Sequence, residues 1–306
     1  MGRKKVIMMN LVIIGGGAIG LLIAANLAKG ANQNVTVITR TEEQAAALSE
    51  SGIGVYSQGR VKIASSTAHR FDFNQADAVI ITVKQYHLPE IASLIRKINL
   101  TCPLFFIQNG MSHLSFLSGL DHHHIFVGTI EHGVKKMKIT DIQHNGVGSW
   151  KIAAYRGDLT KAAFLSKWDS AVFPIEFAED YKSLLTVKLI KNLMINPFTT
   201  LYNVRNGELI SNPFLLLNMH ALYEELEMIF AEDIQGCSFE DIKDLCNKTA
   251  DNQSSMLSDV LNGRKTEVEA LTGYAMKQAE LKNVKAPVLT LLHNSILAIQ
   301  YKAGYQ

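Results

Sequence analysis

The sequence is poor in the residues and segments that mark several classes of protein. It has three cysteines, Cys102, Cys237 and Cys246, with no C-x-x-C pair, and only six prolines. An odd, widely spaced set of thiols predicts neither a disulfide framework nor a zinc site, and is typical of a reduced, cytoplasmic protein. No apolar run reaches the roughly 18 residues of a membrane-spanning helix, so we expect no membrane partner.

A strong charge of either sign is also missing. Thirty Lys and Arg residues face 28 Asp and Glu residues, for a net charge of +2. Without a basic excess, no nucleic-acid partner is expected. His113, His132 and His144 have no metal-ligand spacing, and the run His122-His123-His124 is interpreted as solvated imidazoles, with metal binding as the alternative, so no bound metal is expected. A hydrophobic content of 47% over 306 residues is ordinary for a globular protein of about two domains.

The first half of the chain alternates between two kinds of segment. Short runs rich in β-branched residues lie at 10–14, 35–39, 78–83 and 104–108, and segments of helical composition lie at 19–29, 42–49 and 87–98. This alternation predicts a mostly parallel sheet with helices on both faces. Three more strands, at 126–130, 140–144 and 149–154, are expected to extend that sheet in antiparallel or mixed fashion.

The second half has helical composition throughout. Helices are predicted at 181–196, 215–235, 239–256, 267–282 and 288–301, and Pro197 is expected to end or kink the first. We therefore predict an α/β domain over 1–179 and an all-helical domain over 180–306. Because Met8 and Met9 could each begin the chain, residues 1–8 are interpreted as an extension.

A G-x-G-x-x-G motif separates the first predicted strand from the first helix. Its glycines allow a tight turn, close approach of the backbone to a pyrophosphate, and close packing of helix on strand. The helix N-terminus adds free N–H groups and a partial positive charge. The motif predicts a dinucleotide site formed by Gly15, Gly16, Gly17, Ala18, Ile19 and Gly20. The alternative is a glycine-rich turn without a ligand.

Polar residues follow three other predicted strands. Arg40 stands where NAD-binding folds usually carry an acid, and its guanidinium suits a 2′-phosphate, which favours NADPH. Lys84 and Asn109 end the next two strands, at the edge where ligands of open α/β sheets bind. Each has an alternative interpretation: Arg40 as a surface charge, Lys84 as a solvated lysine, and Asn109 as part of an Asn-Gly turn.

The helix predicted from residue 181 carries a polar stripe. Lys188, Asn192 and Asn196 lie at i, i+4 and i+8, so they share one face of an otherwise apolar helix. Asparagine is a poor helix former, so two in one stripe suggest a role in a core or cleft. The alternative is an amphipathic helix whose polar face meets solvent.

Glu267 lies at another predicted helix start. Thr266 and Glu269 form a T-x-x-E pattern, which predicts a capping box and places Glu267 in the first turn. There Glu267 could pair with Lys188, or could simply be a favourable first-turn acid.

Together these segments resemble the ketopantoate reductase (2-dehydropantoate 2-reductase) family over almost the whole chain. The shared segments are GGGAIG at 15–20, Arg40, VK at 83–84, QNG at 108–110, GTIEHG at 128–133, K-x-x-x-N-x-x-x-N at 188–196, NGEL at 206–209, SSMLSD at 254–259 and RKTE at 264–267. The resemblance implies a Rossmann domain followed by a helical domain, with the active site in the cleft between them.

The resemblance also implies roles for single residues. Lys188 matches the general acid, and Glu267 matches the carboxylate that partners this lysine and the substrate. Substrate contacts are implied for Asn109, Asn192, Asn196 and Ser255. Cofactor contacts are implied for the glycine motif, Arg40, Lys84 and Asn109.

The expected activity is NADPH-dependent reduction of ketopantoate to pantoate, a precursor of pantothenate and coenzyme A. The expected partner is a small 2-oxo acid, and a homodimer is compatible with the sequence. Two alternatives are a reductase of another branched 2-oxo acid, which would keep Lys188, and a non-catalytic NADPH-binding sensor.

Overall fold

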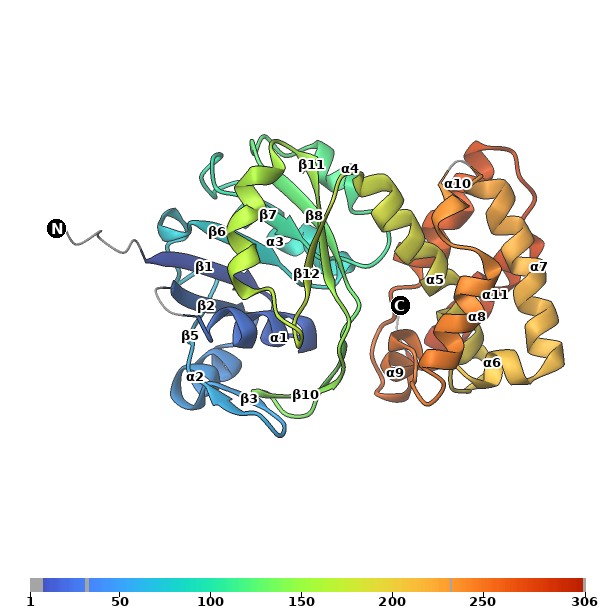
Figure 1. The fold of residues 1–306 in the computed structure, drawn as a ribbon, viewed down its shortest axis with the longest axis horizontal. Coiled ribbons are helices and arrows are strands. Elements are labelled where there is room, and N and C mark those ends of the chain that lie inside the picture. Colours follow the sequence, from blue (N-terminus) through green and yellow to red (C-terminus); the bar gives the residue numbers. More distant parts are fainter. Residues whose placement is uncertain (1–7, 31–32, 232, 305–306) are drawn as a thin grey trace. The chain divides into compact units, whose positions relative to one another are not determined.

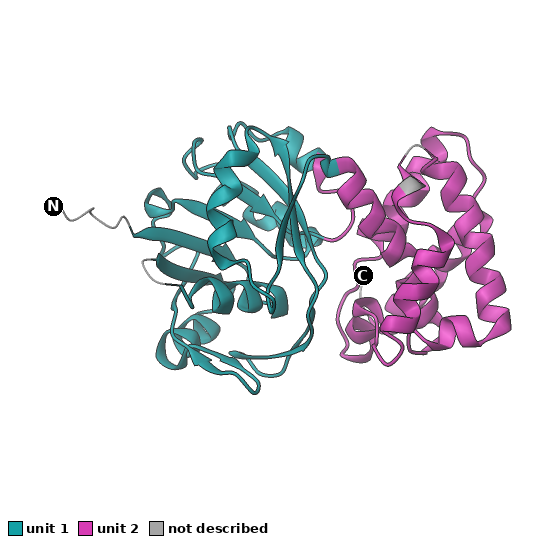
Figure 2. Cartoon of the chain, in the orientation of Figure 1, with its two compact units in different colours: residues 1–108, 115–181 teal, residues 109–114, 182–306 magenta. Residues whose placement is uncertain are grey.

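The computed structural model describes residues 8–30, 33–231 and 233–304. The predicted extension, residues 1–8, lies outside the described residues except for Met8. The chain divides into two compact units (Figure 2), the first formed by Met1–Gln108 and Ser115–Tyr181 and the second by Asn109–Leu114 and Lys182–Gln306.

The first unit is built on an eight-stranded sheet (Figure 1). Its strands, in spatial order, are β12 (Ile175–Ala178), β11 (Trp150–Arg156), β8 (Ile125–Ile130), β7 (Leu104–Phe106), β6 (Ala78–Ile81), β1 (Met9–Ile14), β2 (Gln33–Thr39) and β5 (Ala64–Thr67). Neighbours from β8 to β5 are parallel, β11 runs antiparallel to β8, and β12 runs parallel to β11. The central strands β6 and β7 are buried along their whole length, as parallel sheets covered on both faces require.

The strand order changes direction beside β1. The chain passes from β1 to β2 and then β5 on one side, and then crosses to β6 on the other side. Open α/β sheets bind ligands at such a switch point, outside the carboxyl ends of the strands. The residues that follow β1 and β6 are therefore at the expected binding edge.

A second sheet of four strands packs on the other side of α1 (Ala18–Leu27). Its strands, in spatial order, are β4 (Gly59–Val61), β3 (Ile53–Val55), β10 (Asp141–Gly146) and β9 (Gly133–Lys136). Helix α1 contacts β1 and β2 as well as β3, β9 and β10, which explains why it is apolar and buried almost all round. The other helices of this unit are α2 (Glu42–Ser51), η1 (Phe73–Gln75), η2 (Gln85–His87), α3 (Leu88–Ile95), α4 (Leu114–Ser118) and η3 (Leu159–Trp168).

The second sheet corrects one sequence-based expectation. Residues 140–144 were expected to extend the large sheet, but β10 pairs with β3 and β9 instead. The mixed pairing expected nearby is confirmed for β8 and β11.

The second unit has helices and no strand among its described residues. Its helices are α5 (Tyr181–Tyr202), α6 (Glu208–Ser211), α7 (Pro213–Ile229), η4 (Ile234–Gly236), α8 (Phe239–Lys248), α9 (Ser255–Leu261), η5 (Glu269–Gly273), α10 (Tyr274–Leu281) and α11 (Pro287–Lys302). Polar side chains cap several of them: Asn212 caps α7, Ser238 forms a capping box with Asp241 on α8, and Ser254 caps α9.

Two helix predictions for this unit are corrected. Helix α5 continues through Pro197 to Tyr202, so the helix does not end at the proline, and a kink at Pro197 stays a prediction. The single helix predicted over 239–256 is two helices, α8 and α9, separated after Lys248. No helix in the described part of the chain is both long and apolar enough to cross a membrane.

Candidate active site

The glycine motif forms a tight loop between β1 and α1. Gly15 has φ +125°, and a Cβ there would lie 2.7 Å from the Thr82 hydroxyl oxygen. A Cβ on Gly20 would collide with the carbonyl oxygen of Gly15. The Thr82 hydroxyl also donates to the carbonyls of Ile14 and Gly15, at 3.2 and 3.1 Å. The first and third glycines are therefore required by packing of the loop itself.

Gly17 differs from these two glycines because nothing occupies the space beside it. A Cβ on Gly17 would have no protein atom within 4 Å. Gly17 is the N-cap of α1, and no side chain caps the helix there. Open space beside the uncapped N-terminus of a helix is the arrangement that a phosphate group fits, so the loop suits a dinucleotide.

Side chains from two other elements reach Gly16, between these glycines. The Gln44 amide on α2 and the Lys136 ammonium on β9 both donate to the Gly16 carbonyl, each at 2.8 Å. Sequence reasoning missed both residues. The only signal was a lysine-rich segment around Lys136, which by itself resembles an ordinary solvated turn.

Arg40 follows β2 at an exposed position, and its guanidinium forms no ion pair with any described residue. The acid nearest in sequence, Glu42, is already engaged. Its carboxylate accepts from the Thr67 hydroxyl at 2.9 Å and pairs with His69 and Arg70, each at 3.1 Å. The charge of Arg40 is therefore available to an anion, as the NADPH interpretation requires.

Hydrogen bonds connect the segment that follows β6 with the segment that follows β7. The Gln108 side-chain amide donates to the carbonyls of Ile81 and Val83, at 2.9 and 3.0 Å. Lys84 follows directly, with its ammonium 6.0 Å from the centre of the Tyr86 ring. These contacts set the direction in which the chain leaves both strands at the binding edge.

Asn109 belongs by its contacts to the second unit, where it meets Glu267. Its amide nitrogen donates to Oε2 of Glu267 at 2.9 Å. Gly110 has φ +77°, and a Cβ there would collide with the carbonyl oxygen of Ala270. Asn109 and Gly110 form a bend, which places Asn109 against the segment around Glu267.

Glu267 is 9% exposed and is not part of a helix, which corrects its predicted place in a first turn. The predicted capping box is also absent: the Thr266 N–H donates to the side-chain oxygen of Gln300 at 2.7 Å instead of to Glu269, and the Thr266 hydroxyl accepts from the Val268 N–H at 3.3 Å instead of from that of Glu269. A buried carboxylate needs polar partners, and Asn109 is one of them. Helix capping no longer explains why Glu267 is there.

The polar stripe of α5 runs from a half-buried to a buried position. Lys188 and Asn192 are half-buried, and Asn196 is 5% exposed, so the solvent-facing interpretation is wrong for Asn196. Neither the Asn192 nor the Asn196 side-chain amide has a hydrogen-bond partner within the described part of the chain. A buried amide without a protein partner is suited to bind a polar ligand.

Two adjacent serines at the start of α9 have different environments. Ser254 is buried; its hydroxyl accepts from the Leu257 N–H at 3.1 Å and from the Thr199 hydroxyl at 2.7 Å. Ser255 is exposed. Ser254 therefore stabilises the helix, and Ser255 is the one open to a ligand.

The predicted site residues thus fall into two groups. The first unit holds Gly15, Gly16, Gly17, Ala18, Ile19, Gly20, Arg40 and Lys84, and the second holds Asn109, Lys188, Asn192, Asn196, Ser255 and Glu267. The structure brings Asn109 and Glu267 into direct contact. The described residues contain no cluster of three His, Cys, Asp or Glu side chains that could hold a metal ion.

Two family models match the chain. The model described as ketopantoate reductase PanE/ApbA matches residues 11–157, and that of the C-terminal part of the same family matches residues 180–300. A 2-dehydropantoate 2-reductase of Bacillus subtilis is 37% identical over 297 residues, which cover 95% of this chain and 98% of the relative.

Solved structures of the same family are also similar to this chain. A "probable 2-dehydropantoate 2-reductase" from Bacillus subtilis has a TM-score of 0.84 at 36% identity, over 95% of this chain and 100% of the other. A dimeric ketopantoate reductase from Staphylococcus aureus has a TM-score of 0.79 over 97% of this chain and 100% of the other. Because the Staphylococcus aureus protein is 18% identical, it supports the fold alone.

Proposed function

Since the chain belongs to the ketopantoate reductase family, we propose that it reduces 2-dehydropantoate to pantoate with NADPH. The observation that carries the proposal is the polar group of the second unit. It combines a buried carboxylate held by Asn109 with a stripe of one lysine and two amides on α5. Such a set can donate a proton and orient a small oxygen-rich substrate.

Ketopantoate reductases use NADPH, and the first unit fits that cofactor. The space beside Gly17 and the N-terminus of α1 would hold the pyrophosphate. Arg40 would bind the 2′-phosphate, because its guanidinium is exposed and Glu42 is engaged by Arg70 and His69. We also assign Lys84, at the binding edge, to the cofactor contacts.

We assign the proton transfer to Lys188. When bound, NADPH supplies the hydride that the ketone carbon accepts. The Lys188 ammonium donates a proton to the carbonyl oxygen, so that no alkoxide has to form free in the site. The Glu267 carboxylate, held by Asn109, orients the lysine and a substrate hydroxyl, which is the function we assign to it instead of helix capping.

The remaining polar residues are assigned to the substrate. The Asn192 and Asn196 amides, without protein partners of their own in the described residues, would hydrogen-bond its oxygens. The exposed Ser255 hydroxyl would help bind the carboxylate. These contacts fix the ketone relative to Lys188, which is the positioning that a reductase must provide.

The test compares two lysines of α5. Lys188 and Lys191 are both half-buried, but three residues correspond to about 300° around the helix, and Lys191 lies near Cys237 and Asp241. Lys188→Ala should lower kcat by about 10² to 10⁴, the usual contribution of a positioned general acid, while NADPH still binds. Lys191→Ala should remain close to wild type. Normal turnover by both variants would show that Lys188 is not the proton donor.

We further infer the division of labour along the chain: cofactor binding by residues 1–179, and substrate binding and catalysis by 180–306. The segment Asn109–Leu114 joins the second unit through its contacts. We also propose a homodimer, which is the state of the Staphylococcus aureus protein of the same fold, and sedimentation of the purified protein tests it. A cytoplasmic location, suggested by three free, buried cysteines, stays a prediction.

A further inference from the structure

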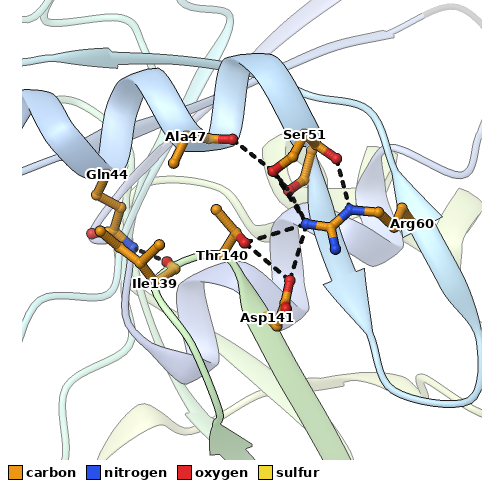
Figure 3. Close-up of polar contacts among 8 residues, drawn as sticks. Gln44, Ala47, Ser51, Arg60, Ile139, Thr140 and Asp141 are labelled. Atoms are coloured by element: carbon orange, nitrogen blue, oxygen red, sulfur yellow. Dashed lines mark hydrogen bonds and ion pairs between the residues drawn. The ribbon is translucent and has the colours of Figure 1, made fainter.

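The carbonyl of Gly16 connects the glycine loop to the β9–β10 hairpin. Gln44 on α2 uses both N–H groups of its amide: one donates to the Gly16 carbonyl and the other to the Ile139 carbonyl, each at 2.8 Å. Figure 3 shows the second of these bonds, at the turn between the two strands. Lys136, the last residue of β9, donates to the same Gly16 carbonyl at 2.8 Å.

The hairpin is also anchored to α2 by a second group of contacts (Figure 3). Arg60 pairs with Asp141 at 3.0 Å and donates to the Thr140 hydroxyl at 3.3 Å. The same guanidinium donates to the Ser51 carbonyl at 2.9 Å, at the end of α2. Lys136 is therefore held beside the glycine loop by contacts that do not depend on a ligand.

The Lys136 ammonium has no counterion among the residues that the structure describes. No carboxylate of the described residues pairs with its ammonium, and the Gly16 carbonyl uses only one of its three N–H donors. Partial burial lowers the pKa of Lys136, but the residue as a whole is exposed, so its ammonium is accessible to an anion from solvent.

We propose that Lys136 binds the pyrophosphate bridge of the dinucleotide cofactor, as a charged partner of the glycine loop. Lys136 binds the carbonyl of Gly16, and Gly16 directly precedes Gly17, beside which the space is open, so the ammonium would be within reach of an anion in that space. The helix N-terminus supplies partial charges, and Lys136 supplies a full one. The inference rests on the proposed use of NADPH.

Binding titrations of NADPH and NADH test the proposal, with Lys135→Met as matched control. Lys135 is the neighbouring lysine of β9, and successive side chains of a strand point to opposite faces. Lys136→Met should raise the Kd of NADPH about 10- to 100-fold, the usual effect of losing a charge-assisted hydrogen bond. Lys136→Arg should retain most of the affinity, and Lys135→Met should equal wild type.

Comparing the affinities for NADPH and NADH shows which part of the cofactor Lys136 contacts. Both carry the pyrophosphate, so Lys136→Met should weaken NADPH and NADH by the same factor, whereas loss of a 2′-phosphate contact would affect NADPH alone. Since the pyrophosphate is remote from the reacting atoms, KM for NADPH should rise while kcat is retained. An NADPH-selective loss, or an unchanged Kd with a lowered Tm, would overturn the assignment.

Chemical footprinting of the wild-type protein keeps the proposal testable if the variants fold poorly. NADPH should protect Lys136, but not Lys135, from acetylation by acetic anhydride. Equal acetylation of Lys136 with and without bound NADPH would contradict the inference. If the wild-type protein binds no NADPH at all, the proposed function fails, and that outcome is distinct from failure of the Lys136 assignment.

Discussion

Gly17→Ala separates the requirements of the fold from those of the cofactor. A methyl group at Gly17 would meet no protein atom within 4 Å, and the residue has φ −79° and ψ −179°, which alanine adopts without strain. The gain from a less flexible unfolded chain, about 0.4–1 kcal/mol, is offset by the poorer N-cap that alanine makes. We expect the free energy of unfolding to stay within about 1 kcal/mol of wild type.

Cofactor binding should respond quite differently. The methyl would occupy the space assigned to the pyrophosphate, so the Kd of NADPH should rise at least about tenfold, the equivalent of about 1.4 kcal/mol. Chemical denaturation and a fluorescence titration with NADPH measure the two effects. Gly20→Ala is the control, because its Cβ would collide with the Gly15 carbonyl and should destabilise the fold directly. An NADPH affinity unchanged by Gly17→Ala would refute the placement of the phosphates beside Gly17.

Three further variants test single parts of the account. Arg40→Ala should raise the KM for NADPH far more than the KM for NADH, and an unchanged ratio would make Arg40 a surface charge. Glu267→Gln should lower kcat/KM by orders of magnitude with the fold intact; near-normal turnover with a lowered Tm would return it to a structural role. Burial lowers the pKa of His113 from 6.5 to about 4. Because unfolding lets this histidine bind a proton, the protein should lose about 3 kcal/mol of stability as pH falls from 6.5 to 4. Denaturation of His113→Phe across that range should show a shallower loss, and an equal loss would assign the pH dependence to other groups.

Local sequence patterns correctly predicted helices and strands whose formation depends mainly on neighbouring residues in the sequence. The strand, glycine loop and helix around Gly15–Gly20 follow from a β-branched run, a fixed glycine spacing and an apolar helix. The strands that escaped prediction are short or polar, such as β5 with the sequence Ala-Ser-Ser-Thr at an edge of the large sheet. Such strands form because a neighbouring strand offers its hydrogen bonds, which periodicity does not reveal.

Two of the wrong predictions depend on contacts with residues distant in sequence. Thr266 and Glu269 do not form a capping box because Gln300, 34 residues away, accepts the Thr266 N–H that Glu269 would have bound. Helix α5 continues past Pro197 because residues 193–200 are buried, and tertiary packing outweighs the roughly 3 kcal/mol that an interior proline costs.

The sequence indicated which residues form the candidate site, but it did not indicate which residues they contact. The i, i+4, i+8 stripe of α5 follows from helix geometry, and the structure adds that its end at Asn196 is buried. The contact between Asn109 and Glu267 joins residues 158 positions apart, and only the folded chain reveals it. The same holds for Lys136, which lies 120 positions from Gly16.

The central claim is that this chain reduces ketopantoate with NADPH through Lys188. The most direct measurement is the rate of NADPH oxidation by the wild-type protein and by Lys188→Ala, with ketopantoate, pyruvate and 2-oxoisovalerate as substrates. The account predicts a clear preference for ketopantoate in the wild type, and loss of most of kcat in the variant while NADPH still binds. A preference for either of the other 2-oxo acids, or binding of NADPH without oxidation by any of them, would contradict it.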